Sequence, residues 1–189
     1  MITLLFTLLV PAALAGWSAN GSENGCNFFL GPVEGTVQPV RAECDWKLPA
    51  DKLHALVAKV ADHDKYFSAV EVCDVLSSSG GRDVAVQVHV ASGISDREVV
   101  LDFAQEDIAN GKRYTWTKSA DQSAAKRGMV AVALDTGKWE ITSTEGGAHV
   151  VYELRYDAGG SVPGFIVRWF QGSGVRTLVG ELKAYAESH

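Results

Sequence analysis

Arg97 is the residue of this chain whose type and position point most directly to chemistry. It lies in the segment GISDREVVLDF (93–103), on the same side of a predicted strand as Val99 and Leu101. A guanidinium keeps its charge inside a protein, so a buried arginine needs an acid, backbone carbonyls, water or the polar end of a ligand. Three placements are open for Arg97: pairing with an inward acid or with backbone at the end of the sheet, contact with a ligand, or solvent exposure near the strand end. Lys118 is predicted to share this face, although its long stem could also reach solvent.

The three cysteines indicate one covalent cross-link. The segment Glu34-Gly35-Thr36 is typical of a turn, and a hairpin centred on Gly35 sets Cys26 directly across from Cys44. We therefore predict a disulfide between Cys26 and Cys44, with Cys44 and Cys73 as the competing pair. Cys73 otherwise becomes a small buried side chain.

We expect no metal, no cofactor and no catalytic residue. The cysteines lack a C-x-x-C spacing and the histidines are scattered along the chain, which argues against a metal site. His63 and Asp64 are interpreted as the solvated end of a helix. In the strand register predicted below, the inner face of the sheet offers Arg97, Lys118 and Tyr152, but no carboxylate or histidine. A proton-transfer enzyme needs such an acid or base in its pocket, so we predict a protein that is not an enzyme.

Length and charge bound the classes of function. The chain has 189 residues, which fits a single domain with a sizeable core, and we expect a monomer. Its 17 Lys and Arg against 23 Asp and Glu give a net charge of −6, and no basic cluster occurs. We therefore expect no nucleic-acid partner.

The first 15 residues, MITLLFTLLVPAALA, are typical of a cleavable secretory signal. An apolar run is followed by Pro11 and then by Ala13-Leu14-Ala15 as a cleavage motif; a retained membrane anchor is the alternative. We predict residues 1–15 as a signal peptide, 16–38 as a polar lead-in with the disulfide hairpin, of which residues 16–25 are expected to be mobile, and 39–189 as the folded domain. The protein is therefore expected to be secreted or periplasmic, where disulfides persist.

Residues 70–156 alternate apolar and polar side chains with the period of β-strands. Three hairpin turns are predicted: between Gly93 and Ile94, at Asn110-Gly111, and at Gly146-Gly147. The turns set Val84 across from Phe103, Phe103 across from Lys118, and Ile141 across from Tyr152.

Because hairpin partners lie on one face of a sheet, these turns predict an apolar inner face. It consists of Val84, Val86, Val88, Val99, Leu101, Phe103, Trp116, Trp139, Ile141, Tyr152 and Leu154. The outer face carries polar residues, among them Gln87, His89 and Glu98. A sheet with one apolar side needs a cover.

A long C-terminal helix is predicted to supply that cover, and a second helix to close one end of the sheet. Pro49 begins a helix over residues 49–62, and Pro163 begins a long closing helix within residues 159–185. The closing helix carries an apolar stripe of Val167, Phe170, Gly174, Leu178, Leu182 and Tyr185. Gly172 and Gly174 leave the middle of this stripe without side-chain volume, which indicates either a kink or close packing against a strand, or a thin wall over a cavity. The predicted fold is α+β, with a curved antiparallel sheet wrapped around the C-terminal helix.

Three segments carry a further signal: Ser95-Asp96-Arg97-Glu98, GKWEIT (137–142) and VVYELRYDAGGSVPGFIV (150–167). With the order strand, helix, six strands and long helix over residues 40–185, the chain resembles the START-related lipid-transfer branch of the SRPBCC, or Bet v 1-like, superfamily. The resemblance implies a helix-grip fold around an apolar cavity that holds a sterol, phospholipid or similar molecule. It also implies that Arg97 lies near the polar end of that cavity.

We therefore predict non-catalytic binding and transfer of a lipid or another hydrophobic small molecule outside the cytoplasm, with transient membrane contact. The expected ligand contacts are Arg97, Val88, Val99, Leu101, Trp116, Lys118, Trp139, Ile141, Tyr152, Phe170 and Gly174. Two alternatives stand beside this prediction. One is a cyclase- or lyase-type enzyme, which relatives of this fold include, and the other is a protein-interaction domain whose interior is filled by its aromatic side chains.

Overall fold

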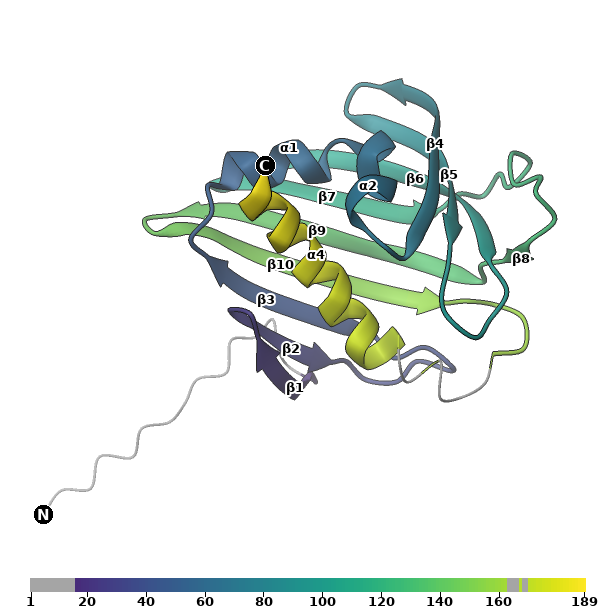
Figure 1. Cartoon of the computed structure of the whole chain (residues 1–189), viewed down its shortest axis with the longest axis horizontal. Coiled ribbons are helices and arrows are strands. Elements are labelled where there is room, and N and C mark those ends of the chain that lie inside the picture. The colour runs from purple at the N-terminus through teal and green to yellow at the C-terminus, as the bar shows by residue number, and fades with distance from the viewer. Residues whose placement is uncertain (1–15, 163–166, 168–169) are drawn as a thin grey trace, which may run out of the picture.

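The computed structural model describes residues 16–162, 167 and 170–189, with the backbone alone at Phe170 and Gln171. Within them, one curved sheet lies against a C-terminal helix (Figure 1). Its strands are β1 (Ser18–Glu23), β2 (Cys26–Leu30), β3 (Val40–Trp46), β4 (Val70–Ser79), β5 (Arg82–His89), β6 (Arg97–Ile108), β7 (Gly111–Lys118), β8 (Val130–Ala131), β9 (Leu134–Thr144) and β10 (Gly147–Asp157). Their order across the sheet is β1-β2-β3-β10-β9-β7-β6-β5-β4, with antiparallel neighbours, and β8 pairs in parallel with β6 outside this order.

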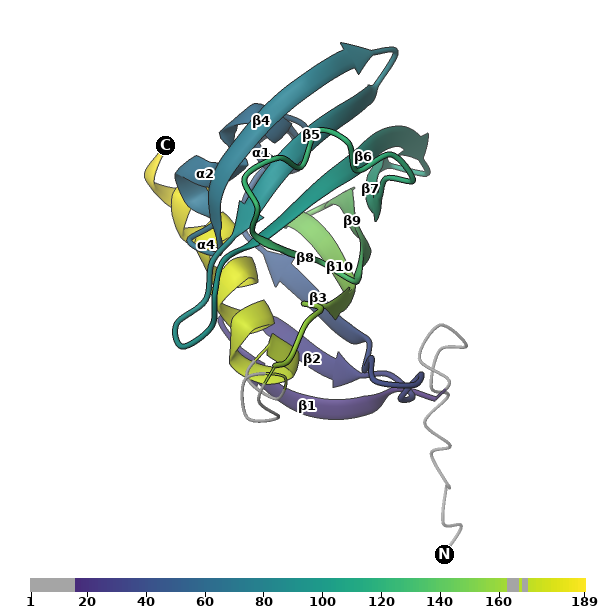
Figure 2. The same ribbon diagram turned by 90° about the vertical axis from the view of Figure 1, so that its right-hand side faces the viewer.

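Helix α4 (Val175–Ser188) lies across the concave side of the sheet (Figure 2). Its buried residues are Val175, Val179, Leu182 and Ala186, which recur at helical spacing and so share one face. A π-helical turn (Phe170–Gly174) precedes it. The predicted α+β fold, a curved antiparallel sheet closed by a C-terminal helix, is confirmed.

The helix predicted over residues 49–62 is broken into short pieces. Helix α1 (Ala50–Val57) is followed by a 3-10 turn (Val60–Asp62) and by the single-turn helix α2 (His63–Tyr66). His63 is buried rather than solvated, and its Nε2–H donates to the carbonyl oxygen of Val57 (3.2 Å). The prediction of a solvated helix end at His63 was therefore wrong, because the break in the helix brings this side chain into the core.

Strands β1 and β2 extend the sheet into residues 18–30, so most of the stretch 16–25, predicted to be mobile, is a strand. Strand β1 pairs with β2, and β2 pairs with β3, so the sheet continues on both sides of residue 39. Arg176 of α4 donates to the backbone oxygen of Asn20 and lies 4.3 Å from the centre of the Phe28 ring, which holds this hairpin against the helix.

Two predicted features lie outside the described residues: the signal sequence (1–15) and the helix start at Pro163. Among the helices that the structure describes, none is long and apolar enough to cross a membrane.

The predicted disulfide between Cys26 and Cys44 is confirmed. The two residues are directly opposed across β2 and β3, and their sulfurs are bonded. The hairpin therefore has the register expected for a turn centred on Gly35. Cys73 is a free, buried cysteine whose thiol donates to the carbonyl oxygen of Val60 (3.0 Å).

Two of the three predicted hairpins of the central sheet are shifted by two residues. Phe103 lies across from Trp116 rather than Lys118, and Ile141 lies across from Val150 rather than Tyr152. Side chains alternate with a period of two along a strand, so a shift of two residues leaves each side chain on its predicted face.

The third hairpin, between β5 and β6, is shifted by one residue, which reverses the face of β5. His89 pairs with Arg97 across the loop of residues 90–96, so the hairpin is centred on Gly93. A shift of one residue exchanges the two faces of a strand. The side chains of Gln87 and His89, predicted outside, lie on the inner side. Three residues predicted inside lie on the outer side: Val84, Val86 and Val88.

The cause of this error is that β5 and β6 are buried on both sides. The segment 119–132 lies beside β6 and across the outer side of both strands. The side-chain amide of Gln122 bonds to the N–H and the carbonyl oxygen of Val100 at the edge of β6 (2.9 Å each). Arg127 in the same segment forms an ion pair with Asp74 on the outer side of β4 (2.6 Å) and another with Glu98 (2.9 Å). Strands buried on both sides carry apolar residues on both faces, so hydrophobicity does not show which face meets the helix.

We expect the disulfide to stabilise the fold by restricting the unfolded chain. The loop that it closes has a sequence separation of 18, for which loop entropy gives about 3 kcal/mol. The double variant Cys26→Ala/Cys44→Ala should lose roughly this free energy of unfolding, measured by urea denaturation. Dithiothreitol should lower the stability of the unmodified protein toward that of the variant and leave the variant unchanged. Equal stability of variant and parent would contradict the prediction.

Candidate functional site

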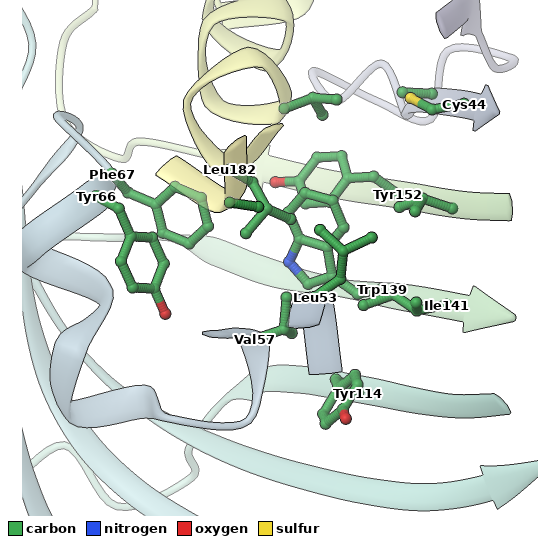
Figure 3. Packing of buried hydrophobic residues seen from close by; sticks show 14 of the residues in the cluster. Cys44, Leu53, Val57, Tyr66, Phe67, Tyr114, Trp139, Ile141, Tyr152 and Leu182 are labelled. Carbon is green, nitrogen blue, oxygen red and sulfur yellow. The ribbon is translucent and has the colours of Figure 1, made fainter. Parts of the chain in front are cut away.

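A cavity of about 690 Å³ lies between the inner side of the sheet and α4. This volume is typical of small-molecule sites, so the interior is not filled by side chains, as the interaction-domain alternative required. Its described lining comes from β4, β5, β6, β7, β9, β10 and α4, and from residues near α2. Figure 3 shows the packed core beside it, where Trp139 and Tyr152 lie next to one another and Leu182 of α4 reaches toward them.

Five of the predicted ligand contacts line this cavity: Leu101, Trp116, Trp139, Tyr152 and Gly174. Gly174 lies at the junction of the π-helical turn and α4, which supports the interpretation of a thin wall. Val99 and Ile141 are on the inner side but are buried in packed core, away from the cavity lining. Val88 faces the outer side because of the shifted register, and the side chain of Phe170 lies outside the described residues. Ligand binding by any of these residues stays a prediction.

Arg97 and Lys118 lie at the end of the sheet, outside the described cavity lining. Only 4 % of Arg97 is exposed, and its guanidinium donates to the backbone oxygens of Ser95 and Ala158 (Nε to Ala158, 3.4 Å). The ammonium of Lys118 donates to the carbonyl oxygen of Val132 (2.6 Å). Backbone carbonyls thus surround both charges, as in the first of the placements considered for Arg97. The geometry gives no support to either residue as a ligand contact.

Aromatic rings form one wall of the cavity. The ring centres of Trp139 and Tyr152 are 4.4 Å apart, and Trp116 stacks on Tyr152 at 5.7 Å. Gly137 lies across from Trp116 in the neighbouring strand, where an added Cβ would come within 2.3 Å of the indole and 2.4 Å of the backbone oxygen of Glu153. The glycine therefore leaves the space in which the Trp116 ring lies.

A polar cluster interrupts this apolar wall; its members are Gln87, His89, Trp116, Asp135 and Tyr156, and all of them line the cavity. Asp135 is 3 % exposed, and its Oδ1 accepts a hydrogen bond from Nε1–H of Trp116 (2.7 Å). Its Oδ2 lies 3.9 Å from Nδ1 of His89, beyond hydrogen-bonding distance. The cluster joins β5, β7, β9 and β10, and so it exists only in the folded sheet.

The hydrogen-bond network assigns the proton of His89. Nε2–H of Gln87 donates to the sulfur of Cys73 (3.2 Å), so Oε1 of Gln87 is the atom that faces Nε2 of His89 (3.0 Å). An amide oxygen only accepts, so His89 carries its proton on Nε2. Nδ1 is then the acceptor for the hydroxyl of Tyr156 (3.2 Å).

Burial shifts the pKa values of the acid and the base of the cluster in opposite directions. Desolvation raises the pKa of Asp135 to about 7, against the hydrogen bond from Trp116, which lowers it. Desolvation also lowers the pKa of His89 to about 4. At neutral pH the cavity therefore presents a carboxyl group that is close to half-protonated and an imidazole that is neutral.

The architecture is similar to that of solved lipid-transfer domains. The STAR-related lipid transfer protein from Xanthomonas axonopodis matches with a TM-score of 0.82 and 18 % identity, over 91 % of this chain and 99 % of that chain. Human StAR-related lipid transfer protein 5 matches with a TM-score of 0.79 and 15 % identity, over 92 % of this chain and 88 % of that chain. By its fold, this chain is a START-like domain.

One of the solved structures with a similar fold is an enzyme. The Zhui aromatase/cyclase from Streptomyces sp. R1128 matches with a TM-score of 0.60 and 13 % identity, over 80 % of this chain and 94 % of that chain. Comparisons of the sequence with protein-family models and with curated proteins find no match. Within the described residues, no group of three or more His, Cys, Asp or Glu side chains is arranged to hold a metal ion.

The sequence analysis did not predict the polar cluster of this START-like domain, although two features of the sequence indicated it. Asp135 lies two residues before Gly137, where the predicted strand began, and continued alternation would have placed it on the inner face with Trp139. The second signal is the uninterrupted apolar run Val99-Val100-Leu101, which is typical of a strand buried on both sides. It indicated that valines in the paired strand need not face inward.

Replacement of Asp135 by asparagine should change the pH dependence of stability. A carboxyl group whose pKa is raised in the folded state costs nothing below its unfolded pKa of about 3.9, and it destabilises the fold progressively up to about pH 7. Relative to the parent, Asp135→Asn should therefore gain roughly 2–3 kcal/mol in unfolding free energy between pH 5 and pH 7.5.

Urea denaturation at the two pH values measures this difference. His63 and His89 are present in both proteins, so their opposite dependence on pH cancels in the comparison. Asp102→Asn, which removes a carboxylate from the other face of β6, is the matched control and should not reproduce the change. A difference between parent and Asp135→Asn that is the same at both pH values would show that Asp135 ionises normally.

Proposed function

We propose that this START-like domain binds a lipid or another hydrophobic small molecule in its cavity without catalysing a reaction on it. The observation that carries this proposal is the cavity of about 690 Å³ between the sheet and α4. Its aromatic wall and the side chains of Leu101, Phe103 and Leu178 offer mostly apolar surface. Each 100 Å² of apolar ligand surface removed from water contributes roughly 2.5 kcal/mol, so a lipid tail would prefer this space to water.

We also propose that the protein transfers its ligand between membranes. Release requires part of the wall to move. Ala91 and Ser92 of the loop 90–96 line the cavity together with Gly174 at the start of α4, so these segments are the proposed exit. The hairpin turn at Asn110-Gly111 is not part of the described lining. Leu76 on the edge strand β4 is 51 % exposed and is a candidate for the transient membrane contact.

The proposed site of action is outside the cytoplasm. The disulfide between Cys26 and Cys44 supports this, because such bonds persist in oxidising compartments and are rare in the cytosol. The predicted signal sequence agrees with the same location.

Ligand capture and a cavity-filling variant test the binding function. Native mass spectrometry and lipid extraction of the purified protein should show a bound hydrophobic molecule or uptake from mixed lipid vesicles. Gly174→Leu places a side chain into the cavity wall and should reduce uptake at least about tenfold, a loss of about 1.4 kcal/mol in binding.

Gly180→Leu is the control for this variant. Gly180 lies on the same helix but outside the cavity lining, and an added Cβ there meets no atom within 4 Å. Its uptake should match that of the parent. A protein that neither carries nor takes up any lipid, or a Gly174→Leu variant that binds as well as Gly180→Leu, would contradict the proposed function.

A proton-transfer enzyme that acts on a hydrophobic substrate is the second candidate, and the polar cluster favours it. Enzymes assign acid and base roles by placing titratable groups in environments that separate their pKa values. Asp135, with a pKa of about 7, could donate a proton at neutral pH, and His89, with a pKa of about 4, is neutral. The similarity of the fold to that of an aromatase/cyclase supports this second candidate.

Deuterium exchange distinguishes the two candidates. The hydrophobic molecule that co-purifies is incubated with the protein in D₂O, extracted and weighed by mass spectrometry. We expect no gain of deuterium on carbon and no new product, because the cavity serves binding. Exchange or conversion that disappears in Asp135→Asn, with the fold intact by circular dichroism, would establish an enzyme instead.

A further inference from the structure

We propose that the polar cluster recognises the oxygen atom of an uncharged head group, above all a hydroxyl, and that the cavity disfavours lipids with an anionic head group. The inference rests on the proposed function, because it concerns the ligand of the same cavity. It names the chemistry at the polar end of that ligand, which neither the fold nor the cavity volume specifies.

Two buried polar groups in the cavity lining have bonding capacity to spare. Oδ2 of Asp135 makes no hydrogen bond within the described residues, although Oδ1 is satisfied by Trp116. Tyr152 is 2 % exposed, and its hydroxyl likewise has no hydrogen-bond partner in the described part of the chain. A polar atom of a ligand that bonds to either group adds a hydrogen bond, which is worth about 0.5–1.5 kcal/mol.

The other nitrogen and oxygen atoms of the cluster are already engaged. Both ring nitrogens of His89 are hydrogen-bonded, to Gln87 and to Tyr156. The amide of Gln87 is used at both ends, by His89 and by the sulfur of Cys73. Hence Oδ2 of Asp135 is the atom of the cluster that is left for a ligand, and the hydroxyl of Tyr152 lies on the adjacent strand.

A hydroxyl suits a carboxyl group in either protonation state. It donates to Oδ2 when Asp135 is ionised and accepts from Oδ2–H when Asp135 is protonated. A ketone oxygen only accepts, so at Asp135 it can form a hydrogen bond only with the protonated carboxyl group. An anionic head group is repelled by the ionised form of Asp135, so it can bind only by shifting Asp135 toward its protonated form.

The charges around the cavity also disfavour an anionic head group. The described lining contains no lysine or arginine, and its other charged side chains are the acidic Asp83 and Glu181. Arg97 on the inner face of β6 is not part of the lining, and its guanidinium donates to the backbone oxygens of Ser95 and Ala158. A phosphate or carboxylate placed in this part of the cavity would have no counter-charge, which makes its desolvation costly.

Several titratable groups face Asp135 from the packed elements. His89 lies on β5, Tyr152 and Tyr156 lie on β10, and Arg97 lies on β6, where its charge acts on Tyr156. Burial raises the pKa of both tyrosines, and Asp135 raises them further. The pKa of His89 is about 4 and that of His63, on α2, is also about 4, so both imidazoles are neutral from pH 6 to pH 8. Asp135 is the member of the polar cluster that titrates in this range.

Three probes with the same tail and different head groups test the inference: 1-tetradecanol, 2-tetradecanone and tetradecanoate. Binding is measured at pH 6 and pH 8 by tryptophan fluorescence, since Trp116 and Trp139 line the cavity, with stoichiometry from native mass spectrometry. The alcohol should bind with a similar dissociation constant at both pH values. The ketone should weaken about tenfold from pH 6 to pH 8, as the protonated fraction of Asp135 falls. Tetradecanoate should bind at least about tenfold more weakly than the alcohol at pH 8.

The variant Asp135→Asn keeps the shape of the side chain and presents an uncharged group at every pH. It should abolish the pH dependence of ketone binding and strengthen the binding of tetradecanoate at pH 8 by at least about threefold. The alcohol should still bind more tightly than tetradecanoate, because the lining of the variant still lacks a counter-charge. Asp102→Asn, on the opposite face of β6, should keep the pattern of the parent protein. Thermal denaturation of each variant checks that the fold is retained.

The outcomes separate this inference from the proposed function. If all three probes bind equally, if tetradecanoate binds more tightly than the alcohol, or if the ketone keeps its pH dependence in Asp135→Asn, the protein binds lipids but the polar cluster does not select the head group. If no probe binds and no lipid is extracted from the purified protein, the proposed function is wrong and the inference is wrong with it.

Discussion

The width of the sheet relative to the helix is the constraint on which the cavity depends. Nine strands follow one another across the sheet, which spans roughly 38 Å at about 4.8 Å per strand before curvature, whereas a helix with its side chains is about 10 Å wide. Helix α4 packs against β3, α1 and α2, so it covers only part of the concave side. The space over β5, β6 and β7 is left to a cavity, because the chain has no further described helix to fill it.

The covered part of the sheet is held by a disulfide and by polar contacts between residues that are far apart in the sequence. The disulfide between Cys26 and Cys44 ties β2 to β3, and Arg176 joins the start of α4 to the β1–β2 hairpin through Asn20 and Phe28. These contacts fix the end of α4 that lies next to Gly174 and the cavity wall. The N-terminal hairpin thus belongs to the architecture that keeps the cavity open.

The polar cluster is a local exception within an otherwise apolar interior. Its carboxyl group is tolerated because Trp116 satisfies one oxygen and because protonation can remove the charge that burial disfavours. Gly137 in turn makes room for the indole that supplies the hydrogen bond. A buried carboxyl group with one oxygen left unbonded lowers the stability of the fold. Binding sites carry costs of this kind because the ligand supplies the missing partner.

The sequence by itself determined the α+β architecture, the disulfide and most of the inner face. Alternation along β7, β9 and β10 placed Trp116, Trp139 and Tyr152 correctly even where the hairpins were shifted, since a shift of two residues preserves the face of each side chain. The tertiary structure alone decided the face of β5. The segment 119–132 covers the outer side of β5 and β6, so valines are stable there and the hydrophobic pattern of β5 does not distinguish its two faces. That one-residue difference brings His89 and Gln87 into the cavity beside Asp135.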